Sequence, residues 1–485
     1  MIDIATASAT ELAAAIRRRE ISSLELLEAY AARIARLNTP YNAVVTLDLE
    51  RARERAKAAD DALAHGENWG PLHGLPITVK DALETAGIRT TGGFPAWSAH
   101  VPTADAVVVD RTVRAGAIVF GKTNLPVLSG DLQSYNPIFG TTTNPWNTAR
   151  TSGGSSGGAA VATAAGFTSF EIGSDIGGSI RTPSNWCGVY GHKPSYGLIP
   201  LRGHIPGAPG TLGEDDLSVV GPLARSAADL DLLLGIQAGP STVSARAWSL
   251  NLPPPRHENL RDFRVAAWLD DDDFPVDAGV RAVLSQSVQA LRGAGASVDE
   301  GARPALRLAD IFDTYLRLLS PVIVGNSSDE EFAGFSSIAA AMPADARDGL
   351  TLMARYGTES HRQWLAANEA RERIRAAFAD FFTRYDVLLT AVTPVTAIAH
   401  DHSEPMPMRS LTINGAPRPY FDLLSWISPA TCAYLPATVA PAGFAADGLP
   451  VGVQIVGPYL EDRTTIHFAA KLAETIGGFV APVLE

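Results

Sequence analysis

The sequence reads TSGGSSGG over residues 151–158 and GSDIGGSIRTP over residues 173–183, and both stretches lie between apolar runs. A flexible linker is the usual interpretation of glycine and serine together. A floppy segment between apolar runs, however, would leave buried backbone groups without hydrogen-bond partners. We therefore interpret the two stretches as tight loops, in which glycine lets the backbone approach a small ligand closely.

The second loop has the features of an anion-binding site. Gly177 and Gly178 precede Ser179, where the pattern predicts that a helix begins. Such a turn presents several converging backbone N–H groups, which an oxyanion hole beside a nucleophile requires. A purely structural glycine turn is the alternative interpretation.

A lysine follows the short apolar run at residues 75–79, which reads as a buried strand that ends at Lys80. Taken alone, Lys80 beside Asp81 indicates a solvated pair or a salt bridge. Burial would change its chemistry, because desolvation lowers the pKa of an amine and lets the neutral form accept a proton near pH 7. Lys80 is therefore a candidate general base only because the sequence also contains the two glycine-rich loops.

The sequence GAIVFGKT at residues 116–123 matches the Walker A spacing of nucleotide-binding loops. That motif needs an exposed loop whose free N–H groups surround a phosphate. The four residues between these glycines are apolar and β-prone, which predicts a buried strand at residues 117–120. We therefore disfavour nucleotide binding here.

The sequence GGSSG at residues 153–157 matches the nucleophile elbow of α/β-hydrolases. An elbow follows a strand directly and needs an Asp and a His later in the chain. Residues 144–150 are turn-like instead, and although His402 and His467 come late enough, neither lies in an obvious partner motif. This interpretation is the weaker one.

Short predicted strands alternate with helices, which indicates an α/β layered fold. Helices are expected before residue 70, where Ser8 with Glu11 and Ser22 with Glu25 form capping boxes. Further helices are expected at residues 105–115, 159–165, 275–380 and 464–476, and further strands at residues 170–172, 386–390 and 451–456.

Composition excludes several classes of protein. The chain has 485 residues, 46% apolar and 19% charged, with a formal net charge of −13, which fits a globular protein. The acidic balance argues against nucleic-acid binding and against docking on an anionic membrane. No apolar run reaches the roughly 18 residues that span a bilayer. Two cysteines, Cys187 and Cys432, fit a reducing compartment, so the cytoplasm is the expected location.

Lys80, the two glycine-rich loops and the spacing between them together resemble the amidase signature family. The likeness continues through CGVYGHKP at residues 187–194 and DGLPVGVQIVG at residues 447–457, and is weakest over about 255–385. The composite pattern is far more specific than either serine motif alone.

The resemblance implies a Ser–cis-Ser–Lys triad. Ser179 would be the nucleophile, Ser155 the bridging serine after a cis peptide bond to Gly154, and Lys80 the general base. Ser156 would be a second hydrogen-bond partner of Lys80.

The same resemblance assigns supporting residues. The oxyanion would be bound by backbone N–H groups of Ile176, Gly177, Gly178 and Ser179. An ion pair between Asp175 and Arg181 would brace this loop. The acyl side of the substrate would be lined by a loop that contains Ser129, Gly130 and Asp131.

The family fold is a single large α/β/α domain, expected here over residues 1–485, with a central mixed β-sheet covered by helices. N-terminal helices are expected over 1–70, and a mainly helical elaboration over about 255–380, above the site. Trp186 and Trp426 are either pocket walls or, more simply, core residues. No metal or organic cofactor is implied. Homodimers occur in the family, but no motif here indicates one.

The expected function is hydrolysis of a small-molecule carboxylic amide to an acid and an amine or ammonia, with aryl amides, esters and carbamates as further candidate substrates. One alternative is the glutaminase subunit of a tRNA-dependent amidotransferase. Residues 195–204 depart from the pattern typical of those subunits. A non-catalytic binding protein is the other alternative, and the presence of all three triad residues argues against it.

Overall fold

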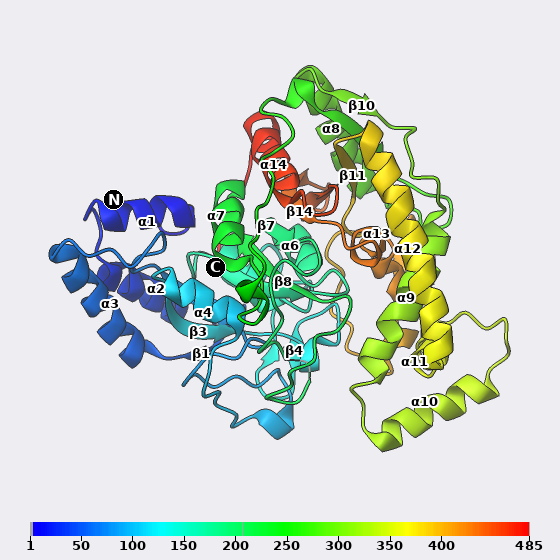
Figure 1. Ribbon diagram of the computed structural model, residues 1–485, viewed down its shortest axis with the longest axis horizontal. Helices are drawn as coiled ribbons and strands as arrows, with labels where there is room; N and C mark the ends of the chain where they lie inside the picture. The colour runs from blue at the N-terminus through cyan, green and yellow to red at the C-terminus, as the bar shows by residue number, and fades with distance from the viewer. Residues whose placement is uncertain (1–2, 206, 485) are drawn as a thin grey trace.

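The structure, a computed structural model, describes residues 3–205 and 207–484, and a mixed eight-stranded β-sheet lies at its centre (Figure 1). In spatial order the strands are β10 (Ser297–Asp299), β9 (Arg264–Trp268), β11 (Val387–Ala391), β15 (Pro450–Val456), β14 (Ala437–Phe444), β7 (Tyr190–Lys193), β8 (Val219–Ala224) and β6 (Glu171–Asp175). The pairs of β9 with β10 and β11 are parallel, and the other pairs are antiparallel. The predicted α/β class with a mixed sheet is confirmed.

A three-stranded sheet continues beyond β6. It has the order β1 (Val44–Leu47), β3 (Ile118–Thr123), β2 (Pro76–Lys80). No backbone ladder joins β2 to β6; instead, Thr78 N donates to Thr168 Oγ1 at 2.9 Å and Ser169 Oγ donates to Pro76 O at 2.9 Å. These contacts bring the end of β2, which carries Lys80, beside β6.

Helices cover the sheets on both sides. They are α1 (Ala9–Arg17), α2 (Ser23–Leu37), α3 (Leu49–Ala64), α4 (Val107–Arg114), α5 (Gly157–Ala164), α6 (Arg181–Cys187), α7 (Ala227–Gln237), α8 (Ala278–Gly293), α9 (Leu308–Val324), α10 (Asp329–Ala341), α11 (Gly349–Gly357), α12 (His361–Arg384), α13 (Ser428–Cys432) and α14 (Asp462–Ile476). Figure 1 shows α9, α11 and α12 packed side by side along one side of the molecule, with α1 to α3 at the opposite end. Both predicted capping boxes are present.

The helix expected to begin at Ser179 begins at Arg181 instead. The reason is the carboxylate of Asp175, which accepts hydrogen bonds from the backbone N–H groups of Gly178, Ile180 and Arg181. These bonds wrap residues 176–180 around Asp175 as a loop.

Several residues singled out by motif matches are part of the core. The Walker-like segment forms β3, as expected. Trp186 and Trp426 are buried in the core, and their indole N–H groups donate to Val395 O and Phe274 O, respectively, both at 3.1 Å. Cys187 and Cys432 are buried free thiols.

Within residues 3–205 and 207–484, no helix combines the length and the apolar character needed to cross a bilayer.

The first turn of α5 packs against backbone with no space for a side chain. Gly158 N donates to Asn124 O at 3.1 Å, and a Cβ at Gly158 would lie 2.4 Å from Asn124 N. We expect Gly158→Ala to destabilise the protein by about 1–3 kcal/mol, because overpacking against backbone is not relieved by a rotamer change. Thermal unfolding measures this effect. The control is Gly293→Ala at the end of α8, where no atom lies within 4 Å of the added Cβ. Equal melting temperatures of the two variants would contradict the prediction.

Candidate active site

Lys80, at the end of β2, is completely buried and contacts two serine hydroxyls. Its Nζ donates to Ser155 Oγ at 2.7 Å and to Ser174 Oγ at 2.9 Å. Burial lowers the pKa of Lys80 to about 7, although the negative charges of Asp175 and Glu171 oppose this shift. Near neutral pH, a large fraction of this amine is therefore uncharged and able to accept a proton.

Ser155 lies two residues before α5, and its peptide bond to Gly154 is cis, as expected. A Cβ at Gly154 would lie 2.6 Å from Gln133 N and 2.7 Å from Asp131 O. Glycine at this position therefore allows the Ser155 loop to pack directly on the backbone of the loop predicted to line the acyl side.

The second partner of Lys80 is Ser174 and not Ser156. Ser156 Oγ donates to Ser174 O at 3.3 Å, and Ser174 N donates back to Ser156 Oγ at 3.4 Å. Ser156 thus ties the two glycine-rich loops together, while Ser174 at the end of β6 presents its hydroxyl to Lys80. Ser174 lies in the second loop motif, but only the packing of β2 against β6 reveals this contact.

Ser179 lies just before α6 with 4% of its surface exposed. Ser156 N donates to Ser179 O at 3.1 Å, which holds the backbones of the two loops together. The Ser179 hydroxyl has no hydrogen-bond partner in the described part of the chain. Among the described residues, the structure thus forms the contact between Lys80 and Ser155 but no hydrogen bond between the hydroxyls of Ser155 and Ser179.

Three of the four predicted oxyanion donors are free. Within the described residues, the N–H groups of Ile176, Gly177 and Ser179 have no acceptor. The N–H of Gly178 donates to Asp175 Oδ1 at 3.0 Å, so this predicted donor is already engaged. The loop thus presents three N–H groups beside the Ser179 hydroxyl.

A phenol from a distant helix fixes this loop. Tyr315 on α9 is completely buried, and its hydroxyl donates to Ile176 O at 2.9 Å. Burial raises the pKa of Tyr315 far above its ordinary value, so the phenol stays protonated and remains a donor. Tyr315 belongs to no sequence motif, so its contact with the loop could not be predicted from the sequence.

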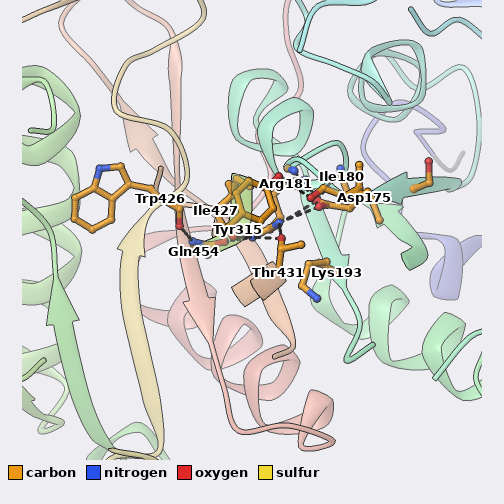
Figure 2. Close-up of polar contacts among 12 residues, drawn as sticks. Asp175, Ile180, Arg181, Lys193, Tyr315, Trp426, Ile427, Thr431 and Gln454 are labelled. Carbon is orange, nitrogen blue, oxygen red and sulfur yellow. Dashed lines mark hydrogen bonds and ion pairs between the residues drawn. The ribbon is translucent and has the colours of Figure 1, made fainter. Parts of the chain in front are cut away.

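The predicted ion pair between Asp175 and Arg181 is present and fully buried (Figure 2). Arg181 Nε lies 3.0 Å from Asp175 Oδ2, and Nη2 lies 2.9 Å from Oδ1. Burial alone would raise the pKa of Asp175, but the charge and hydrogen bonds of Arg181, with help from Lys193, bring it below its ordinary value. The carboxylate therefore stays ionised.

The other guanidinium N–H groups of Arg181 reach three further residues. They donate to Ile427 O at 2.9 Å, Gln454 Oε1 at 2.8 Å and Thr431 Oγ1 at 2.7 Å. Figure 2 shows these groups arranged around the guanidinium. The ion pair thus links the oxyanion loop to α13 and β15.

The three predicted substrate-binding residues differ in their availability. The carboxylate of Asp131 accepts hydrogen bonds from Arg409 Nη1 at 2.6 Å, Tyr420 OH at 2.8 Å and Tyr135 OH at 3.0 Å. Gly130 N donates to Val127 O. Ser129 Oγ is buried and has no partner among the described residues. Asp131 therefore braces the loop in this structure, and Ser129 has the one unengaged polar side chain of the three.

Comparisons with known proteins show the family to which the chain belongs. Residues 25–466 match the family model described as Amidase. A glutamyl-tRNA(Gln) amidotransferase subunit from Thermosynechococcus vestitus is 32% identical over 96% of this chain and 97% of its own length. A crystal structure described as an amidase shares 27% identity, with a TM-score of 0.78 over 97% of this chain and 100% of that chain.

A bacterial aryl acylamidase of the amidase signature family has the same fold, with a TM-score of 0.81 over 97% of this chain and 96% of that chain, at 24% identity. The family model covers nearly the whole chain, including both loops and Lys80. The protein therefore belongs to the amidase signature family of hydrolases.

Proposed function

We propose that the protein hydrolyses carboxylic amides with Ser179 as nucleophile, Ser155 as proton relay and Lys80 as general base. One observation carries this proposal. A buried lysine with a pKa of about 7 contacts the hydroxyl of Ser155, beside a loop that presents three free N–H groups. Such a site supplies the base and the anion stabilisation that an unactivated serine needs.

The reaction starts when Ser179 Oγ attacks the amide carbonyl carbon. Ser155 Oγ takes the proton of Ser179 and passes its own proton to the neutral Lys80 amine. The carbonyl oxygen becomes an oxyanion, which accepts hydrogen bonds from the free N–H groups of the loop. When the C–N bond breaks, the proton returns from Lys80 through Ser155 to the leaving nitrogen. Water then cleaves the acyl-enzyme by the same proton route.

The amidotransferase relatives support a second candidate function, the release of ammonia from glutamine for a partner protein. Their similarity extends over nearly the entire chain and favours this candidate over a stand-alone amidase. It would require a protein partner, whereas a stand-alone amidase would not.

A local feature favours the stand-alone amidase. The segment at 195–204, which departs from the amidotransferase pattern, lies directly against the residues that follow Lys80. Glu84 N donates to Gly203 O at 2.9 Å, and Leu83 forms an isolated antiparallel β-bridge with His204. The segment that departs from the amidotransferase pattern therefore contacts the residues that follow the proposed base, Lys80. Both candidates use the same site and differ in the amide and in the partner.

Substitution of the serines tests the triad. We expect Ser179→Ala to reduce kcat by more than about 10³-fold, because it removes the attacking oxygen. Ser155→Ala is expected to cost about 10²–10⁴-fold, the typical range for loss of proton transfer. Melting temperatures serve as the control for folding. Full activity of Ser179→Ala combined with loss of activity in Ser155→Ala would replace our assignment with a nucleophile at Ser155.

Removal of the Tyr315 hydroxyl tests the oxyanion loop. Tyr315→Phe releases the Ile176 carbonyl, and a net loss of about 1 kcal/mol corresponds to a fall of about fivefold in kcat. KM should change little, because the loop acts on the transition state. The matched control is Tyr385→Phe, whose phenol donates to Asp299 on β10, at the edge of the central sheet opposite β6, and contacts neither α9 nor the loop. A changed KM with an unchanged kcat in Tyr315→Phe would refute this role.

A substrate comparison separates the two candidate functions. The purified chain alone is assayed on anilides, aliphatic amides, carbamates, esters and glutamine, with ammonia and amine release as readouts. Faster turnover of anilides than of glutamine by the lone chain supports a stand-alone amidase. Turnover of glutamine alone, or activity only after a partner is added, supports the amidotransferase role. Hydrolysis of none of these substrates under either condition would contradict both.

A further inference from the structure

A buried carboxyl that the proposed chemistry does not use lies close to the base. Glu171, the first residue of β6, is completely buried. One carboxyl oxygen accepts a hydrogen bond from Thr78 Oγ1, and the other accepts one from Ile172 N at 3.1 Å. A carboxyl removed from water in this way requires compensation by donors or cations.

Glu171 helps to form the junction at which Lys80 lies. Thr78 and Lys80 are two residues apart on β2, so their side chains leave the strand on the same side. Thr78 contacts Glu171, and Lys80 contacts Ser174, and both of these partners belong to β6. These two side-chain contacts join strands that have no backbone ladder between them.

The negative charge of Glu171 acts on the pKa of two buried lysines. Lys80 on β2 and Lys122 on β3 are both influenced by this carboxylate, which raises the pKa of each amine against the larger effect of burial. Lys122 Nζ donates to Leu83 O and to the hydroxyls of Thr85 and Thr90, and so does not contact the serines.

Three other titratable groups lie around Lys80, and each has an identified partner or a fixed protonation state. Asp175 on β6 is paired with Arg181, and Asp81 accepts hydrogen bonds from Thr91. His204 remains neutral, because burial and the charge of Lys80 lower its pKa to about 3. Asp81 and Glu171 both contact no arginine, but of these two carboxyls only Glu171 carries a charge that raises the pKa of Lys80.

We propose that Glu171 is a positioning residue, which through Thr78 fixes the junction of β2 and β6 and sets how readily the Lys80 amine releases its proton. This inference rests on the proposed role of Lys80 as general base. Burial raises the pKa of Glu171 to about 7, against the hydrogen bond of Thr78 and the charge of Lys122. The carboxylate form of Glu171 in turn raises the pKa of Lys80. Ionisation of Glu171 makes Lys80 harder to deprotonate.

The pH dependence of kcat/KM tests the proposal. For the wild-type enzyme on an anilide, or on glutamine if only glutamine is turned over, kcat/KM should rise with pH around a midpoint near 7, as Lys80 loses its proton. Glu171→Gln keeps the shape of the side chain but removes its negative charge. Lys80 then deprotonates more easily, and the midpoint should fall by about 0.5–1 pH unit. At one pH unit below the wild-type midpoint, kcat/KM is compared as a fraction of each enzyme's own plateau value. This fraction should be higher in Glu171→Gln than in the wild type by about threefold or more.

A second variant keeps the test valid if Glu171→Gln does not fold. Thr78→Val removes the hydroxyl donor, favours the protonated carboxyl and should shift the midpoint in the same direction, by a smaller amount. The matched control is Asp229→Asn, a buried carboxyl that binds the backbone of Ala9 and Thr10. Its midpoint should equal that of the wild type.

The outcomes distinguish this inference from the proposed function. Retention of wild-type rates by Lys80→Met and Ser179→Ala would overturn the function itself. Loss of activity in these two variants, with a midpoint in Glu171→Gln that is unchanged or raised, would overturn the role of Glu171 alone. If only Thr78→Val folds, an unchanged midpoint in that variant overturns it equally.

Discussion

The buried ion pair of Asp175 and Arg181 is the interaction on which the geometry of the site depends. Its carboxylate binds three backbone N–H groups of the following loop, and its guanidinium binds α13 and β15. Removal of one member of such a pair leaves an uncompensated buried charge, at a typical cost of about 3–5 kcal/mol. Charge complementarity, and not the start of a helix, therefore determines which loop N–H groups stay free for an oxyanion.

A low amine pKa does not by itself identify a base in this protein. Burial lowers the pKa of Lys80 and of Lys193 to about 7, and that of Lys122 to about 8. Lys193 Nζ donates to Pro194 O, and Lys122 Nζ contacts a carbonyl and two threonines. Only Lys80, among these three lysines, contacts the serine hydroxyls of the glycine-rich loops. Its neighbours, and not its basicity alone, indicate its role.

The sequence predicted those parts of the site that are encoded locally. Apolar β-branched residues before Lys80 predicted β2, and the loop motif with its resemblance predicted the cis bond and the ion pair. The contacts of Tyr315, Ser174 and Glu171 were not predicted, since each depends on how separate elements pack. The resemblance to the family implied Gly178 as an oxyanion donor, but a motif does not reveal that the Asp175 carboxylate binds the same N–H.

The contact of Tyr315 has a consequence for how this fold accommodates different amides. α9 lies far along the chain from both glycine-rich loops, yet it supplies the donor that holds the Ile176 carbonyl. A change in the packing of α9 would move this phenol and, with it, the loop that presents the free N–H groups. Since every amide would use the same oxyanion loop, a shift of α9 would slow the reaction whichever substrate is bound. The hydrogen bond of 2.9 Å from Tyr315 to Ile176 O thus makes the rate depend on the packing of a helix that belongs to neither glycine-rich loop.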